Sequence, residues 1–118
     1  SGNRLTYRDV KYVQGKDDTE AALKASVINH GKMAHLKFYG GKLTENLVQA
    51  TARDAFGTLL LVLQDAGLRV LWHVHDEVIL EVQPGFKEEI EALMSTRPDW
   101  AQSLPIAAEG DELDHYEK

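Results

Sequence analysis

Cysteine is absent from this chain of 118 residues, and proline occurs only three times. Without cysteine the chain forms neither disulfides nor thiolate metal sites. The chain contains no run of about 18 apolar residues, which excludes an ordinary membrane-spanning helix. The first residues also lack the basic and then apolar pattern of a signal peptide. Together these absences predict a protein of the cytoplasm.

Positive charge is also scarce, since 13 lysines and arginines oppose 19 aspartates and glutamates, for a net charge of −6. A free-standing nucleic-acid-binding domain usually carries a basic face. Here the basic residues concentrate in the first half, and the chain from Asp54 onward is acidic. Two interpretations stay open: an ordinary solvated surface, or one basic functional surface on an otherwise acidic protein.

The hydrophobic pattern predicts a single α+β domain over residues 1–118. We expect an antiparallel β-sheet with one long and one shorter helix packed on one face. Within the first forty or so residues, 14–21 are expected to form a loop and 30–32 a turn. The expected elements are a β-ribbon over 1–41, a long helix over 42–67, a hairpin over 68–83, a shorter helix over 86–96 and a C-terminal loop and strand over 97–118.

The expected long helix carries signals at both ends and a polar stripe between them. Glu45 is expected in the first turn, where a carboxylate complements the helix dipole. Gly67 stands where a C-terminal cap is expected. Glu45, Gln49 and Arg53 are spaced four apart with Asn46 beside them, so they share one face. That face is either solvated, with glutamate-to-arginine pairing, or a strip of donors that contacts a phosphate backbone.

The segment "LWHVHDEVILEV", residues 71–82, places ionisable groups in the middle of apolar strand sequence. Charged groups in such surroundings are costly unless something binds them. We expect a tight hairpin with Asp76 and Glu77 at its tip, where two repelling carboxylates suit a divalent cation. Mg²⁺ takes carboxylate and phosphate oxygens and needs only one or two protein carboxylates. A plain acidic turn is the alternative.

A second metal hypothesis concerns His73 and His75, which lie two residues apart and therefore on one face of a strand. With Asp76 they form a potential transition-metal site. This pattern is compatible with an unrelated metal-dependent hydrolase, although a further well-placed ligand is not evident in the sequence.

Several motifs in order resemble family A DNA polymerases, in particular their phage branch. "VHDEVILEV" resembles the third motif of that family, a strand–turn–strand with His-Asp-Glu. "YGGKLTENLVQATARDAFG" resembles the helix that precedes this motif. "PDWAQSLPIAAEG" and the final Tyr-x-Lys resemble the end of phage polymerases, and "SGNRLTY" resembles the segment after the fingers. The resemblance runs essentially end to end and implies part of a palm subdomain.

The resemblance also implies roles for the hairpin residues. In the family the aspartate of His-Asp-Glu binds the catalytic magnesium ions, so Asp76 is expected to do so. The glutamate supports the metal site and the primer end, a role expected for Glu77. The histidine lies near the primer terminus, a position expected for His75.

For the helix, the resemblance implies that Gln49 contacts duplex DNA. Bacterial members carry an arginine and an asparagine where this chain has Gly41 and Glu45, so those two DNA contacts are in doubt. Lys42, Asn46 or Arg53 are expected to take their place.

Other parts of the family pattern are missing, namely the first motif with its metal-binding aspartate and the fingers helix that grips the nucleotide. The chain is therefore expected to be inactive alone and to work with the remaining polymerase segments, primer–template DNA and a deoxynucleotide. A non-catalytic palm remnant that binds DNA or a protein is the alternative. An exposed apolar surface and self-association of the chain are also expected.

Overall fold

The computed structural model describes residues 1–14 and 22–116 of the chain. Most of the loop predicted at residues 14–21 lies outside the described residues. Where the sequence predicted a single domain, the chain divides into two compact units. We call residues 2–51 the N-terminal unit, and residues 52–118 together with Ser1 the C-terminal unit.

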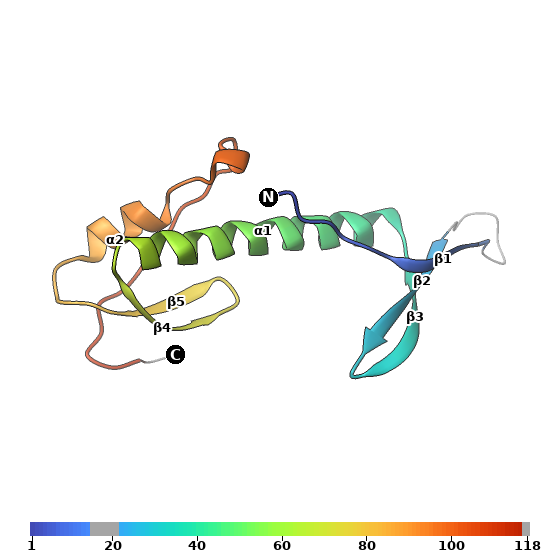
Figure 1. Ribbon diagram of the computed structural model, residues 1–118, viewed down its shortest axis with the longest axis horizontal. Helices are drawn as coiled ribbons and strands as arrows, with labels where there is room; N and C mark the ends of the chain where they lie inside the picture. Colours follow the sequence, from blue (N-terminus) through green and yellow to red (C-terminus); the bar gives the residue numbers. More distant parts are fainter. Residues whose placement is uncertain (15–21, 117–118) are drawn as a thin grey trace. The chain divides into compact units, whose positions relative to one another are not determined.

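The predicted α+β class is confirmed, with antiparallel strands in two separate sheets and one long helix (Figure 1). Strands β1, β2 and β3 form the first sheet in that order, and β4 pairs with β5 in the second. The described elements are β1 (Arg8–Val13), β2 (Ala22–Asn29), β3 (Lys32–Phe38), α1 (Gly40–Asp65), β4 (Arg69–Val74), β5 (Glu77–Glu81), α2 (Lys87–Met94) and a 3₁₀ turn, η1 (Asp99–Ala101).

The sheet of the N-terminal unit is an antiparallel ribbon, as the sequence predicted. His30 and Gly31 connect β2 to β3, and both have positive φ, at 48° and 75°. Two-residue hairpin turns with positive φ at both positions match the twist of the strands. One face of the ribbon supplies the core of this unit, where Phe38 is buried and meets the ring of Tyr7 edge-on at 5.0 Å between centroids.

Helix α1 begins at Gly40 and ends at Asp65, two residues earlier at each end than predicted. The amide of Leu43 donates to the carbonyl of Tyr39 at 3.1 Å, so helical pairing starts directly after β3. Glu45 consequently lies beyond the first turn, which contains no acidic residue, and its predicted first-turn position is wrong. None of the helices within the described residues is both long and apolar enough to cross a membrane.

The predicted cap at Gly67 is confirmed. Gly67 has φ of 77°, its amide donates to the Gln64 carbonyl at 2.9 Å, and the Leu68 amide donates to the Leu63 carbonyl at 3.0 Å. These two bonds define a Schellman motif, which satisfies carbonyls that the helix itself leaves without partners.

Replacing Gly67 with alanine is expected to destabilise the chain by roughly 1 kcal/mol, because an L-residue is strained at positive φ. A Cβ added there would meet no atom within 4 Å, so the cost arises from the backbone and not from a clash. Urea unfolding monitored by circular dichroism measures the change in the free energy of unfolding. Gly57→Ala is a matched control, since Gly57 lies inside α1 with open space for a Cβ. That control is expected to stabilise the helix, and equal loss in both variants would contradict the assignment.

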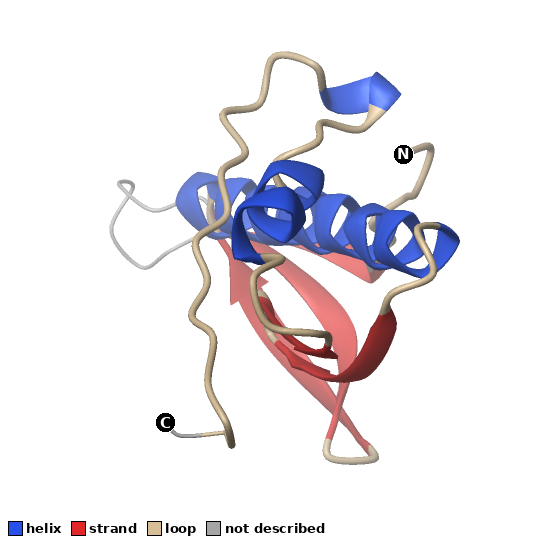
Figure 2. Ribbon diagram, turned by 90° about the vertical axis from the view of Figure 1, so that its left-hand side faces the viewer, coloured by secondary structure: helices blue, strands red, loops and turns tan. Residues whose placement is uncertain are grey.

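The core of the C-terminal unit is a stripe along the second part of α1. Ala55, Leu59 and Leu63 are buried at a spacing of four residues, and Ala101 from η1 is buried as well. Within this unit the end of α1 and helix α2 lie on the same side of the β4–β5 hairpin (Figures 1 and 2).

The C-terminal strand predicted within residues 97–118 is wrong for the described part, because residues 102–116 contain no strand. This segment instead satisfies some of its backbone groups with side chains near α2. The amide of Ala108 donates to Ser95 Oγ at 3.1 Å, and the amide of Gly110 donates to Glu91 Oε1 at 2.8 Å. Backbone donors that are already paired in this way are not used in a sheet ladder.

Candidate metal-binding hairpin and polar helix face

The turn of the β4–β5 hairpin consists of His75 and Asp76, because Val74 pairs with Glu77. The sequence predicted Asp76 and Glu77 at the tip, and this is wrong by one residue since Glu77 is the first residue of β5. His75 adopts φ of 56°, a conformation that non-glycine residues rarely adopt and that histidine tolerates better than most. Backbone pairing, and not the position of the charges, therefore sets the turn.

Asp76 and Glu77 are nevertheless consecutive residues at the exposed end of the hairpin. Both side chains are exposed, and within the described residues neither carboxylate has a hydrogen-bond or ion-pair partner. Asp76 projects from the turn, whereas Glu77 shares the face of its cross-strand partner Val74. Carboxylates of consecutive residues that pair with no cation of the described chain are donors of the type that suits a hard divalent cation.

A bulge in β4 shifts its pairing with β5 between Val70 and Trp72. Val70 pairs with Leu80 and Trp72 pairs with Ile79, so Leu71 is the additional residue on β4. Bulges increase local twist and redirect the side chains that follow. Trp72 thereby shares a face with Val74 and Glu77.

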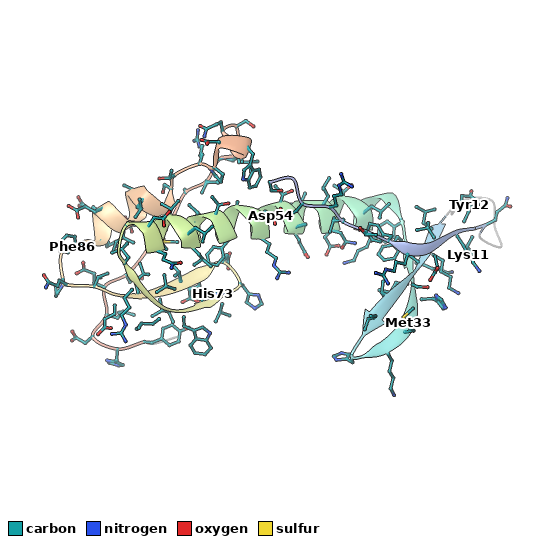
Figure 3. All side chains as sticks on the ribbon, in the orientation of Figure 1. Lys11, Tyr12, Met33, Asp54, His73 and Phe86 are labelled. Carbon is teal, nitrogen blue, oxygen red and sulfur yellow. The ribbon has the colours of Figure 1, made fainter. Side chains whose placement is uncertain are left out.

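The predicted transition-metal site at His73, His75 and Asp76 is wrong. His73, labelled in Figure 3, pairs with Val78 within β4–β5. Its ring meets Phe56 of α1 edge-on at 5.9 Å between centroids. His75 leaves the strand for the turn, so the two histidines do not share a strand face. Over residues 1–14 and 22–116, no three histidine or acidic side chains converge to hold a metal. The role of Phe56 as the partner of His73 had no signal in the sequence, because the two residues are 17 positions apart.

On α1 the polar stripe is organised around Glu45, in the N-terminal unit. Lys42 Nζ donates to Glu45 Oε1 at 2.8 Å, and Gln49 Nε2 donates to the same oxygen at 3.2 Å. The hydrogen bond to Glu45 raises the pKa of Lys42 above its ordinary value. The glutamate thus pairs with Lys42 and Gln49, and not with the arginine that the solvated-face interpretation assumed.

The remaining helix candidates lie in different surroundings. Asn46 Nδ2 donates to the Tyr7 hydroxyl at 3.0 Å, so this amide also ties the helix to the residues before β1. Arg53 is exposed and belongs to the C-terminal unit. At Gly41 an added Cβ would lie 2.9 Å from the Tyr39 ring, so a larger residue there requires that ring to move.

The chain is similar over its whole length to the DNA polymerase of Bacillus phage SP02, with 41% identity over 121 aligned residues. The aligned region covers 100% of this chain and 19% of the phage protein, so the chain spans about a fifth of that relative. No protein-family model matches the chain. No solved structure matches it either.

Proposed function

We propose that the chain is the C-terminal palm portion of a DNA-directed DNA polymerase of the phage branch of family A. The observation that carries this proposal is the 41% identity to a phage DNA polymerase along the whole chain. The exposed pair Asp76 and Glu77, which has no partner among the described residues, supports it because template-directed nucleotide transfer requires carboxylates that hold metal ions.

In this proposal Asp76 and Glu77 hold Mg²⁺ through their carboxylate oxygens. When bound, the metal lowers the pKa of the primer 3′-hydroxyl and stabilises the leaving pyrophosphate. The hairpin fixes the backbone from which both side chains project, since a two-residue turn between paired strands leaves little freedom. His75, beside Asp76 in the turn, is assigned a position near the primer terminus.

We assign the polar face of α1 to the DNA. Gln49 is the proposed duplex contact, and Glu45 orients its side-chain amide through the 3.2 Å hydrogen bond. Lys42 is held by the same carboxylate and remains protonated at neutral pH, so it can approach a phosphate. Asn46 and Arg53 complete the proposed set of contacts.

The proposed partners are primer–template DNA, a deoxynucleotide and the other segments of the polymerase. Two side chains of β4 are exposed although they are large and apolar, Leu71 at 53% and Trp72 at 63%. Surfaces of this kind support burial against another protein segment or a second copy of the chain. The isolated chain is expected to be inactive, because two carboxylates do not hold two Mg²⁺ ions in the required geometry.

A chimera tests this function. The aligned segment of the Bacillus phage SP02 polymerase is replaced by this chain, and primer extension is measured with Mg²⁺ and all four deoxynucleotides. We expect template-directed extension by the chimera and none by a control in which a glycine–serine linker of equal length replaces the segment. A chimera that is folded by circular dichroism but inactive would refute the proposal.

A further inference from the structure

Strand register aligns three lysines across the ribbon of the N-terminal unit. Lys11 on β1 is directly opposite Lys24 on β2, and Lys24 is directly opposite Lys37 on β3. We call these three residues the lysine row. Side chains opposite one another share a face, and like charges in such positions destabilise a sheet. Sheet stability therefore does not explain the row.

The row lies on the face of the ribbon that points away from its buried apolar side chains, and one buried polar side chain, Ser26, shares the face of the row. Ala25 and Phe38 are buried on the other face, and neighbours along a strand point to opposite faces. Lys11, labelled beside Tyr12 in Figure 3, is exposed, as is Lys37, whereas Lys24 is half-buried. Lys11 and Lys37 are thus accessible to a ligand, and Lys24 is partly accessible.

The neighbouring positions add further polar and basic groups. Arg8 is opposite Ser26, which is opposite His35, and a hydrogen bond joins Ser26 Oγ to His35 Nδ1 at 3.2 Å. Five side chains line an open hollow on this face: Asp9, Lys11, Lys24, Ser26 and His35. Asp9 is the acidic member, and within the described residues no carboxylate lies within ion-pair distance of the lysine row.

We propose that the lysine row binds the phosphate groups of a nucleic-acid backbone. Strands are spaced about 4.8 Å apart, so the row spans roughly 10 Å. On each strand of a duplex one phosphate occurs about every 3.4 Å of helix axis, so a row aligned with the axis spans about three of them. The chain as a whole carries a net charge of −6, whereas this face gathers positively charged side chains. The choice of nucleic acid over another polyanion rests on the proposed function.

Salt-dependent binding tests this proposal on the 118-residue chain. The probe is a fluorescein-labelled 20-base-pair DNA duplex with a single-stranded overhang, and the dissociation constant is measured by anisotropy between 25 and 200 mM salt. Each phosphate contact contributes about 0.9 to the slope of log affinity against log salt. The triple variant Lys11→Gln, Lys24→Gln, Lys37→Gln is expected to lower this slope by about 2 to 3.

The matched control removes the same number of positive charges from the C-terminal unit, by Arg69→Gln, Lys87→Gln and Arg97→Gln. It is expected to change the slope by less than about 1. Equal slopes for the wild type and the lysine-row variant would overturn the proposal. So would the absence of DNA binding by the wild type, or lysine-dependent binding to phosphatidylserine vesicles without binding to the duplex.

The result of the DNA-binding experiment can be told apart from the result of primer extension by the chimera. A lysine row that fails to bind DNA in an active chimera refutes only the further inference. A row that binds DNA in a segment whose chimera is inactive refutes only the polymerase assignment.

Discussion

Replacing Asp76 with asparagine in the active chimera is expected to lower the rate of nucleotide incorporation by at least about 10³-fold. Asparagine keeps the size of the side chain and removes its charge, so the proposed metal ion loses a ligand. Metal ions contribute several kcal/mol of transition-state stabilisation, and about 4 kcal/mol corresponds to three factors of ten. Single-turnover primer extension at saturating deoxynucleotide measures the effect directly.

The folded structure is expected to tolerate this substitution, because the Asp76 side chain is exposed and has no ion-pair partner among the described residues. Asp65→Asn is the matched control, since Asp65 is also exposed and lies at the end of α1, away from the turn. That control is expected to retain incorporation within about twofold. Extension by the Asp76 variant at the rate of the control would exclude this aspartate as a metal ligand.

Leu63→Ala is expected to have the largest effect on stability, about 2–5 kcal/mol. Leu63 is 0% exposed and is the largest fully buried side chain among the described residues. Its truncation removes apolar surface from the stripe formed with Ala55 and Leu59 and leaves a cavity. Small domains have only about 5–15 kcal/mol of stability in total, so a substantial part would be lost.

Leu61→Ala provides the comparison on the same helix, since Leu61 is 61% exposed. Both substitutions remove the same atoms and change helix propensity equally, so the difference between them reports burial alone. Urea unfolding of the 118-residue chain is expected to show a change of less than about 0.5 kcal/mol for Leu61→Ala. Equal midpoints for the two variants would contradict the core described for the C-terminal unit.

Local sequence signals predicted the elements that depend on neighbouring residues. The periodicity of α1 predicted its extent within two residues at each end, and Gly67 marked its end because a left-handed residue is needed there. The turn of β2–β3 at His30 and Gly31 followed from the same kind of signal. The segment at 102–116 gave a wrong prediction, because its amides bind side chains that are distant in sequence, such as Ser95.

Register explains the error at the carboxylate hairpin. The charge pattern placed Asp76 and Glu77 at the tip, but the ladder pairs Val74 with Glu77 and leaves His75 in the turn. A shift of one residue reverses which face each side chain takes. The transition-metal hypothesis failed for the same reason, because it required His73 and His75 to be on one strand.

The sequence by itself determined that Asp76 and Glu77 lie together, because adjacent residues are joined covalently whatever the fold. Through periodicity and turn chemistry it also predicted α1 and the β2–β3 turn. Only the tertiary structure aligned Lys11, Lys24 and Lys37, which are 13 residues apart at each step. Their alignment depends on strand pairing and on the irregularity between Arg8 and Lys11, where Asp9 adopts positive φ. The two-residue turn at His30 and Gly31 sets the β2–β3 register, which pairs Lys24 with Lys37. The pairing of Lys11 with Lys24 depends instead on the irregularity in β1, which no local pattern specified.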